Sequence, residues 1–341
     1  MDGILNVIKP VGMTSFDVVA LVRRWTGTRK VGHTGTLDPD AAGVLTVCVG
    51  RATRAVEALT DKDKTYRAEL CLGVETDTQD ATGSVTRAAE PVADEGRIAE
   101  AIRSMAGDRL QVPPMHSAIK IDGKKLYELA REGREVERKP RPVSIHACEP
   151  VGFRRDADGT VRVLIDVRCS KGTYIRTLCH DIGRMLGCGG HMVFLLRTRT
   201  GPFRIEDSHT LEALADASAA GTIGSLLEPV DAAFAHLPAL HVPPQIAQRL
   251  LNGQTVPLDR LTADQKGTVP PGPEAPGVCR VYEGDRFLGL GATEMEPAAA
   301  PDGRLRLFRQ MPQAGCASAS GSASAPGETE AGMHPAERND A

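Results

Sequence analysis

The segment at residues 29–43 combines glycines, polar side chains and carboxylates, a composition typical of a functional loop. Within it, Asp38 stands directly before Pro39, whose ring restricts the backbone of the preceding residue. Glycines allow the backbone to approach a ligand closely. The positively charged residues that bracket the segment are Arg29, Lys30, Arg51 and Arg54. The alternative is that Asp38 and Pro39 form only an Asx-type turn that leads into the apolar strand that follows.

A second polar cluster lies at residues 169–176, where a strand pattern meets a helix pattern in the sequence Cys-Ser-Lys-Gly-Thr-Tyr-Ile-Arg. Arg176, His180 and Arg184 follow at spacings of four, so they share a helix face separate from the apolar stripe. An arginine in this position can keep a nearby carboxylate ionised or hold a phosphate. The alternative is a surface ion pair, which contributes little.

Two aromatic rings also stand among polar residues. Tyr66 lies between Lys64 and Arg67 in a chain with only 4% aromatic residues, which favours stacking on a nucleic-acid base. A plain core tyrosine is the alternative. His33 lies in the glycine-rich segment, and its ring can act as an acid or a base. We interpret it instead as a hydrogen-bonding turn residue.

The familiar signatures of nucleotide and zinc chemistry are absent from the sequence. There is no Walker A loop, no G-x-G-x-x-G, no H-E-x-x-H and no G-x-S-x-G. Asp77, Asp80 and Gly83 resemble a calcium loop but lack the downstream glutamate of an EF-hand, so they predict a structured turn. The eight cysteines include no C-x-x-C pair, which indicates reduced and mostly buried thiols.

Length and charge bound the class of protein. The 341 residues are 41% hydrophobic and contain no apolar run long enough to span a membrane, and the first residues do not form a signal peptide. We therefore expect a soluble cytoplasmic protein. The net charge of -3 hides a basic middle, because residues 101–200 carry 19 Lys and Arg against 11 Asp and Glu. Such a segment attracts phosphates, although solvated cations on helix faces are the alternative.

The apolar patterns predict alternating helices and strands. Helices are expected at 14–26, 95–105, 125–132 and 174–186, the first opened by a capping box of Thr14 and Asp17. Strands are expected at 4–8, 44–49, 65–72, 117–121 and 161–169, with hairpin turns at Asp122-Gly123 and Asp158-Gly159. The frequent hairpins predict an α+β fold with a mixed, mainly antiparallel sheet flanked by helices. A loop is expected at 262–277 and a disordered tail beyond about Gln313.

Several short motifs follow one another along the chain. Residues 32–39 read Gly-His-Thr-Gly-Thr-Leu-Asp-Pro, and residues 9–15 read Lys-Pro-Val-Gly-Met-Thr-Ser. Further motifs lie at 42–45, 66–68, 76–80, 113–120, 123–131, 169–176 and 195–203. In this order, the motifs resemble those of the bacterial TruB-type tRNA pseudouridine synthases. The resemblance covers roughly residues 3–210, and a segment from about 235 to 312 resembles a small PUA-like RNA-binding domain.

The resemblance implies a catalytic pseudouridine synthase domain at 1–230 and a PUA-like RNA-binding domain at 235–312. Composition adds a disordered low-complexity tail at 313–341. The resemblance also implies isomerisation of uridine 55 in the T-loop of tRNA to pseudouridine, with no cofactor, no metal and no protein partner. A monomer is therefore expected.

Carried over by position, the family's roles fall on residues of these motifs. Asp38 matches the essential aspartate, Tyr66 the tyrosine that stacks on the target base, and Arg176 the arginine that pairs with the aspartate. The other matches are Tyr174 and Leu195 in the pocket lining, His33 in RNA distortion and Lys9 in support of the catalytic loop. The sequence departs from the common pattern at Asp40, Ala42 and His116, which affects details of the loop.

Two other functions are compatible with these motifs. One is a non-catalytic RNA-binding or RNA-folding protein on the same scaffold, and the other is an RNA-directed glycosylase that frees uracil. The residues alone also leave open whether the aspartate attacks C1′, stabilises an oxocarbenium-like species or removes a ribose proton.

Overall fold

The structure is a computed structural model, which describes residues 1–117, 119–121, 123–258, 277–296 and 300–311. Three expectations fall outside these residues: Asp122 of the first hairpin turn, the loop at 262–277 apart from Gly277, and the tail at 313–341. The elements given below belong to the described part of the chain.

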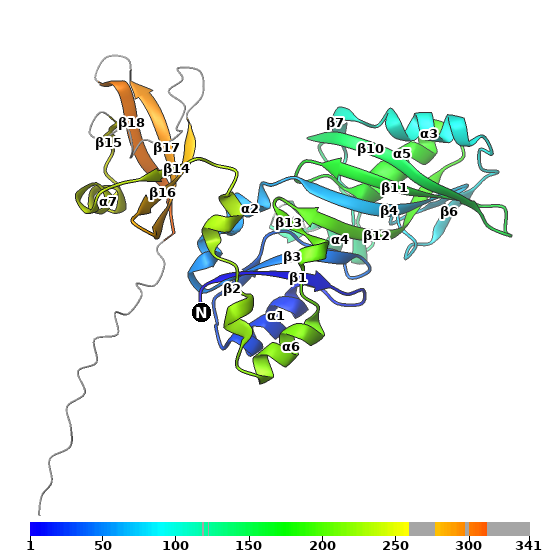
Figure 1. Cartoon of the computed structure of the whole chain (residues 1–341). Coiled ribbons are helices and arrows are strands. Elements are labelled where there is room, and N and C mark those ends of the chain that lie inside the picture. The colour runs from blue at the N-terminus through cyan, green and yellow to red at the C-terminus, as the bar shows by residue number, and fades with distance from the viewer. Residues whose placement is uncertain (118, 122, 259–276, 297–299, 312–341) are drawn as a thin grey trace, which may run out of the picture.

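The larger sheet contains nine of the described strands, and its main path runs β1-β3-β12-β4-β11-β10-β7 (Figure 1). Its strands are β1 (Gly3–Lys9), β2 (Val31–His33), β3 (Ala42–Val49), β4 (Lys64–Leu72), β7 (Gly107–Gln111), β10 (Arg141–Arg155), β11 (Val161–Cys169), β12 (Gly190–Thr200) and β13 (Phe203–Arg204). All neighbours pair antiparallel except β12 with β3, which pair in parallel. The predicted mixed, mainly antiparallel sheet is confirmed.

Helices flank this sheet, as the apolar stripes predicted. In Figure 1, α3 (Glu95–Arg103) and α5 (Ile175–Leu186) lie beside the part of the sheet that contains β10, β11 and β4. The helices α1 (Ser15–Thr26) and α6 (Leu211–Ala219) lie beside β1 and β2. The predicted capping box is present, because Thr14 and Asp17 bond each other's backbone amides. The apolar stripe of α5 belongs to a buried core. Val163 and Ile165 of β11 lie in the same core.

The remaining elements of the larger unit are short. The helical ones are η1 (Gly50–Ala55), α2 (Val56–Thr60), α4 (Leu126–Arg131), η2 (Ile205–Asp207), η3 (Ile223–Leu226) and η4 (Val230–Phe234). Two small hairpins pair β5 (Val74–Thr76) with β6 (Val85–Ala88), and β8 (Lys120–Ile121) with β9 (Lys124–Lys125). The strand expected at 117–121 is wrong in length. In the described residues it is only β8, two residues long, because its hairpin partner β9 is equally short. No described helix is long and apolar enough to cross a membrane.

A second sheet of five strands follows, in the order β14-β16-β17-β18-β15 (Figure 1). Its elements are β14 (Ala239–His241), α7 (Pro244–Leu251), β15 (Val256–Pro257), β16 (Val278–Glu283), β17 (Arg286–Glu296) and β18 (Ala300–Gln310). One buried cluster spans both units, since Ile4 and Phe203 belong to it together with Phe287. An ion pair of 2.8 Å between Arg309 and Glu57 also joins β18 to α2.

The parallel pairing of β3 with β12 brings two halves of the larger sheet together. Gly43 at the start of β3 has a φ of 110°, and a Cβ there would lie 2.2 Å from the carbonyl oxygen of Arg197. Only glycine therefore permits this close approach. The loop at 34–41 runs directly into this junction, and this places Asp38 between the two halves.

Candidate active site

A cavity of about 280 Å³ opens at the junction of β3, β12 and β4. Five of the residues expected at the site line it: Asp38, Tyr66, Tyr174, Arg176 and Leu195. They come from the loop before β3, from β4, from the start of α5 and from β12, so the fold brings together segments that are far apart in the sequence. The cavity also includes Lys64 and Arg197.

Asp38 lies in a turn that a backbone hydrogen bond closes, so its side-chain carboxylate is not used in the turn. The backbone N–H of Ala41 donates to the carbonyl oxygen of Asp38 at 3.1 Å and forms the turn by itself. The Asp38 side chain is 47% exposed, and its Oδ2 lies 3.1 Å from Nη2 of Arg176. The carboxylate is therefore ion-paired on one side and accessible to a ligand on the other.

Arg176 is buried, with a side chain only 7% exposed, so the interpretation as a surface ion pair is wrong. Its guanidinium contacts two carboxylates, Asp38 at 3.1 Å and Asp80 at 3.2 Å, and donates to the carbonyl oxygen of His116 at 2.8 Å. A planar fork with several donors suits such simultaneous contacts. Arg176 therefore has a fixed orientation toward Asp38.

The sequence indicates only a structured turn around Asp80, whereas the structure adds its contact with Arg176. Burial by itself raises the pKa of Asp80, but hydrogen bonds from Thr78 and Thr82 and the charge of Arg176 lower this pKa overall. Asp80 is therefore ionised at neutral pH. No local pattern announces this contact, because Asp80 and Arg176 are 96 positions apart.

Gln111 also holds the site and was not expected from the sequence. Its amide nitrogen donates to the carbonyl oxygen of Tyr174 at 3.0 Å, and its amide oxygen accepts from the N–H of Tyr174 at 2.8 Å. Tyr174 is the N-cap of α5 and has no side-chain cap of its own. Gln111 therefore fixes the start of the helix that carries Arg176.

We expect Gln111→Leu to lower kcat/KM about tenfold, because losing two hydrogen bonds of about 1 kcal/mol each loosens the start of α5. The Tm should also fall, because the half-buried N–H of Tyr174 loses its acceptor. Steady-state kinetics and thermal unfolding measure both effects. Gln254→Leu is the matched control, since Gln254 is exposed and distant from the cavity. Wild-type kinetics in Gln111→Leu would contradict this role.

Tyr66 is 9% exposed, and it is both a core residue and part of the cavity wall. Burial raises its pKa, so the ring is a neutral phenol at neutral pH. In the sheet, Tyr66 lies opposite Arg197 on one side and Val167 on the other. Leu195 lies two positions before Arg197 on β12, so the two side chains point to the same face of the sheet.

Lys9 and His33 do not line the cavity. Lys9 is fully buried, and its Nζ donates to the carbonyl oxygens of Pro10, Met13 and Pro39, which ties β1 to the loop of Asp38. Desolvation lowers the pKa of Lys9 to about 8. His33 Nδ1 accepts from the N–H of Gly35 at 3.3 Å, and burial lowers its pKa, so the ring is neutral at pH 7.

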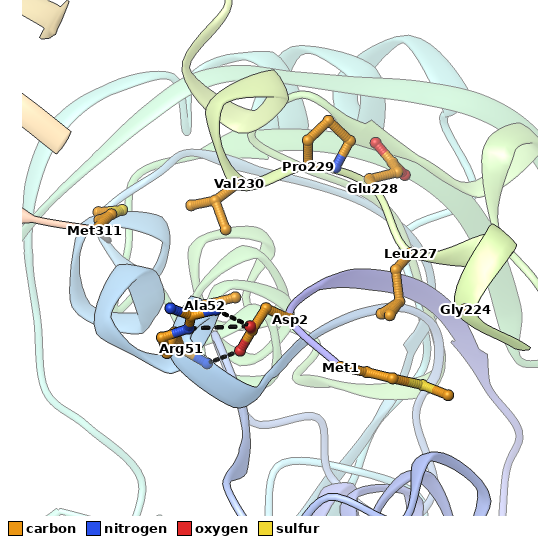
Figure 2. A pocket seen from close by; sticks show the side chains of 10 residues that line it. All are labelled: Met1, Asp2, Arg51, Ala52, Gly224, Leu227, Glu228, Pro229, Val230 and Met311. Atoms are coloured by element: carbon orange, nitrogen blue, oxygen red, sulfur yellow. Dashed lines mark hydrogen bonds and ion pairs between the residues drawn. The ribbon is translucent and has the colours of Figure 1, made fainter. Parts of the chain in front are cut away.

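A larger cavity, of about 460 Å³, lies near the N-terminus (Figure 2). Its Asp2 carboxylate binds Arg51 at 2.7 Å, and burial raises the pKa of Glu228. None of the residues that line it is aromatic, and both carboxylate oxygens of Asp2 accept hydrogen bonds from the backbone and side chain of Arg51. The smaller cavity is the better candidate for chemistry.

The cysteines and the side chains that could bind a metal do not form a further site in the described residues. The seven described cysteines are free and buried, which agrees with the expectation of reduced thiols. Within the described part of the chain, no group of three His, Cys, Asp or Glu side chains lies close enough together to hold a metal ion.

The chain matches three consecutive family models. "TruB family pseudouridylate synthase (N terminal domain)" matches residues 23–175, and "tRNA pseudouridylate synthase B C-terminal domain" matches 176–235. "Pseudouridine synthase II TruB, C-terminal" matches residues 238–306. Together the matches include strands of both sheets, although β1 lies before the first match.

Relatives and solved structures agree with these matches. A tRNA pseudouridine synthase B of Alkaliphilus oremlandii is 46% identical, over 87% of this chain and 94% of that protein. One of Symbiobacterium thermophilum is 52% identical, over 74% and 82%. The archaeal box H/ACA sRNP Nop10-Cbf5 complex has a similar fold, with a TM-score of 0.65, 26% identity and coverage of 91% and 86%. On this evidence of motif, fold and sequence, the chain belongs to the TruB family of pseudouridylate synthases, and it is an isomerase.

Proposed function

We propose that this chain isomerises uridine 55 in the T-loop of tRNA to pseudouridine, without a cofactor or a metal. The observation that carries the proposal is the contact of 3.1 Å between Asp38 and Arg176 in a cavity of about 280 Å³, which suits a single nucleoside. The relatives named tRNA pseudouridine synthase B support tRNA as the substrate.

The reaction must break the bond between N1 and C1′, turn the uracil and join C5 to C1′. An accessible carboxylate beside the ribose can attack C1′, stabilise an oxocarbenium-like species or remove a ribose proton. Asp38 is the carboxylate that lines the cavity, and its free side faces the space for the nucleoside. Arg176 orients Asp38, and Asp80 in turn orients Arg176.

The target base must leave the stacked T-loop before it reaches the cavity, at a cost of a few kcal/mol. Stacking on Tyr66 offsets about 1 to 3 kcal/mol of this cost. Tyr174 and Leu195 complete the walls around the base. His33 lies outside the cavity, next to Phe16 at 5.5 Å between ring centroids, where it is available to contact the distorted RNA.

We assign residues 1–230 to the catalytic domain, 235–312 to a PUA-like RNA-binding domain and 313–341 to a tail that catalysis does not need. We also propose that the chain acts as a monomer. A tRNA substrate supports a cytoplasmic location.

The proposal is tested with a T-stem-loop RNA that carries tritium at C5 of uridine 55. Only formation of the bond between C5 and C1′ expels that hydrogen, so tritium release distinguishes an isomerase from an RNA-binding protein. An assay for free uracil on the same RNA tests for a glycosylase. We expect stoichiometric tritium release and no free uracil; binding without release, or free uracil, would refute the proposal.

The stacking role of Tyr66 predicts which of two variants binds RNA more tightly. Tyr66→Phe keeps the ring and should preserve RNA binding, whereas Tyr66→Ala should weaken it by about 1 to 3 kcal/mol, the size of one stacking contact. Filter binding with the T-stem-loop measures both. A tighter complex with the alanine variant than with the phenylalanine variant would discredit stacking.

The tail assignment predicts that deletion of residues 313–341 leaves activity intact. This segment has few bulky apolar residues and lies beyond the last strand of the second sheet. Tritium release from full-length tRNA, compared for the two chain lengths, gives the answer. A loss of more than about tenfold would assign the tail a part in binding or turnover.

A further inference from the structure

Two buried cations beside Tyr66 have no part in the chemistry described so far. Lys64 is 6% exposed and Arg197 is 2% exposed, and both line the catalytic cavity. No ion pair joins either of them to a carboxylate in the described residues. Burying a cation without such a partner is costly, so these side chains call for a specific reason.

The sheet register places both cations around the ring of Tyr66. Lys64 lies two positions before Tyr66 on β4, so both side chains point to the same face. Arg197 lies directly opposite Tyr66 on β12. A uracil stacked on the Tyr66 ring would therefore have Lys64 near one edge of the base and Arg197 near another.

The hydrogen bonds of the two cations differ in one respect. Arg197 donates to the carbonyl oxygens of Val44, Thr36 and Gly35, so its guanidinium is held in the wall. Lys64 Nζ donates to the carbonyl oxygens of Thr60 at 2.5 Å and Lys62 at 2.6 Å. An ammonium has three donors, so in the described residues one N–H of Lys64 is left for a ligand in the cavity.

We propose that Lys64 is a further catalytic residue, whose remaining N–H stabilises the negative charge on uracil when the bond between N1 and C1′ breaks. This inference rests on the proposed function. The electron pair of that bond stays on the base. C1′ is left bonded to Asp38, as an oxocarbenium ion, or in a glycal whose ribose proton Asp38 holds and later returns. When C5 bonds to C1′, the C5 proton leaves to solvent and N1 takes up a proton from solvent, while Lys64 keeps its own protons. Fixed donors aimed at developing charge lower a barrier most in a dry site.

The surroundings of Lys64 support this assignment. Desolvation and the charge of Arg197 lower its pKa to about 8, while Cys169, Asp61 and Asp63 raise it. Lys171 is a further charged group in the cavity wall, where it pairs with Asp61 at 2.7 Å. Lys64 is thus charged at pH 7 and loses its proton as the pH rises through about 8. An anion in the cavity is the partner that the buried ammonium lacks.

The first test compares single-turnover rates at saturating enzyme, measured as loss of the target nucleoside because a C5 fluorine cannot leave as a proton does. The T-stem-loops carry uridine or 5-fluorouridine at position 55. Fluorine stabilises the uracil anion, so the base leaves with less help. We expect Lys64→Met to lose on the order of 100-fold with uridine and clearly less with 5-fluorouridine. Lys62→Met, which removes an equal charge two positions away, should leave both rates within about twofold.

The second test separates catalysis from a structural role of Lys64 as an anchor of the carbonyl oxygens of Thr60 and Lys62. Lys64→Arg keeps a positive charge at all accessible pH, so it should restore most of the uridine rate at pH 7. It should also weaken the loss of activity above pH 8, of which the titration of Lys9, with a pKa of about 8, accounts for the remainder. Equal losses of Lys64→Met on both substrates, or a Lys64→Arg rate as low as that of Lys64→Met, would overturn the inference. Wild-type turnover in the same assay reports on the proposed function separately.

Discussion

Asp38→Asn is expected to reduce the single-turnover rate of pseudouridine formation by about 10⁴-fold or more, with tRNA affinity within a few-fold of wild type. Asparagine has nearly the same shape, so the loop and its contacts stay in place. The amide, however, is neither a nucleophile nor a base at the ribose, and each of the three possible routes requires the carboxylate. Nucleoside analysis of digested RNA measures the product, and filter binding measures the affinity.

Asp40→Asn provides the matched control for this variant. Asp40 lies in the same loop, is exposed and does not line the cavity, so its rate should stay close to wild type. Appreciable turnover by Asp38→Asn would remove Asp38 from its role. A parallel loss of affinity would instead indicate that the substitution disrupts the loop.

Arg176→Lys is expected to lower the single-turnover rate by about 10² to 10³-fold although the positive charge is kept. The guanidinium contacts Asp38, Asp80 and the carbonyl oxygen of His116 at once. A lysine ammonium is shorter and lacks the planar fork, so it cannot make all of these contacts. Asp38 would then lose its fixed orientation toward the ribose, and the effect should appear in kcat more than in KM.

Arg184→Lys is the appropriate comparison, because Arg184 lies eight positions further along α5 and is exposed. It should behave as wild type. If Arg176→Lys were also close to wild type, the charge alone would suffice, and the bridging geometry would have no catalytic importance.

The sequence predicted the parts of the fold that local patterns govern. The apolar stripe and the capping box of Thr14 and Asp17 predicted α1, and the alternation of Val161, Val163, Ile165 and Val167 predicted β11. These signals are local because a helix or strand buries one face at a fixed period. Frequent hairpin turns gave the mainly antiparallel character of the sheet, including the turn at Asp158-Gly159.

The contacts that complete the site carry no such local signal. Asp80 reaches Arg176 across 96 positions, and Gln111 reaches Tyr174 across 63. The parallel junction of β3 with β12 involves only two residue pairs, and Gly43 alone hints at the close approach there. Asp38, Tyr66 and Arg176 were assigned to the site from the family resemblance, whereas composition alone left the alternatives open.

Tritium release from a T-stem-loop labelled at C5 of uridine 55, compared for wild type and Asp38→Asn at saturating enzyme, tests the central claim most directly. The account predicts one tritium released per RNA by wild type and release at background level by the variant, with both proteins bound to the RNA. Equal release by the two proteins, or none by wild type, would contradict it.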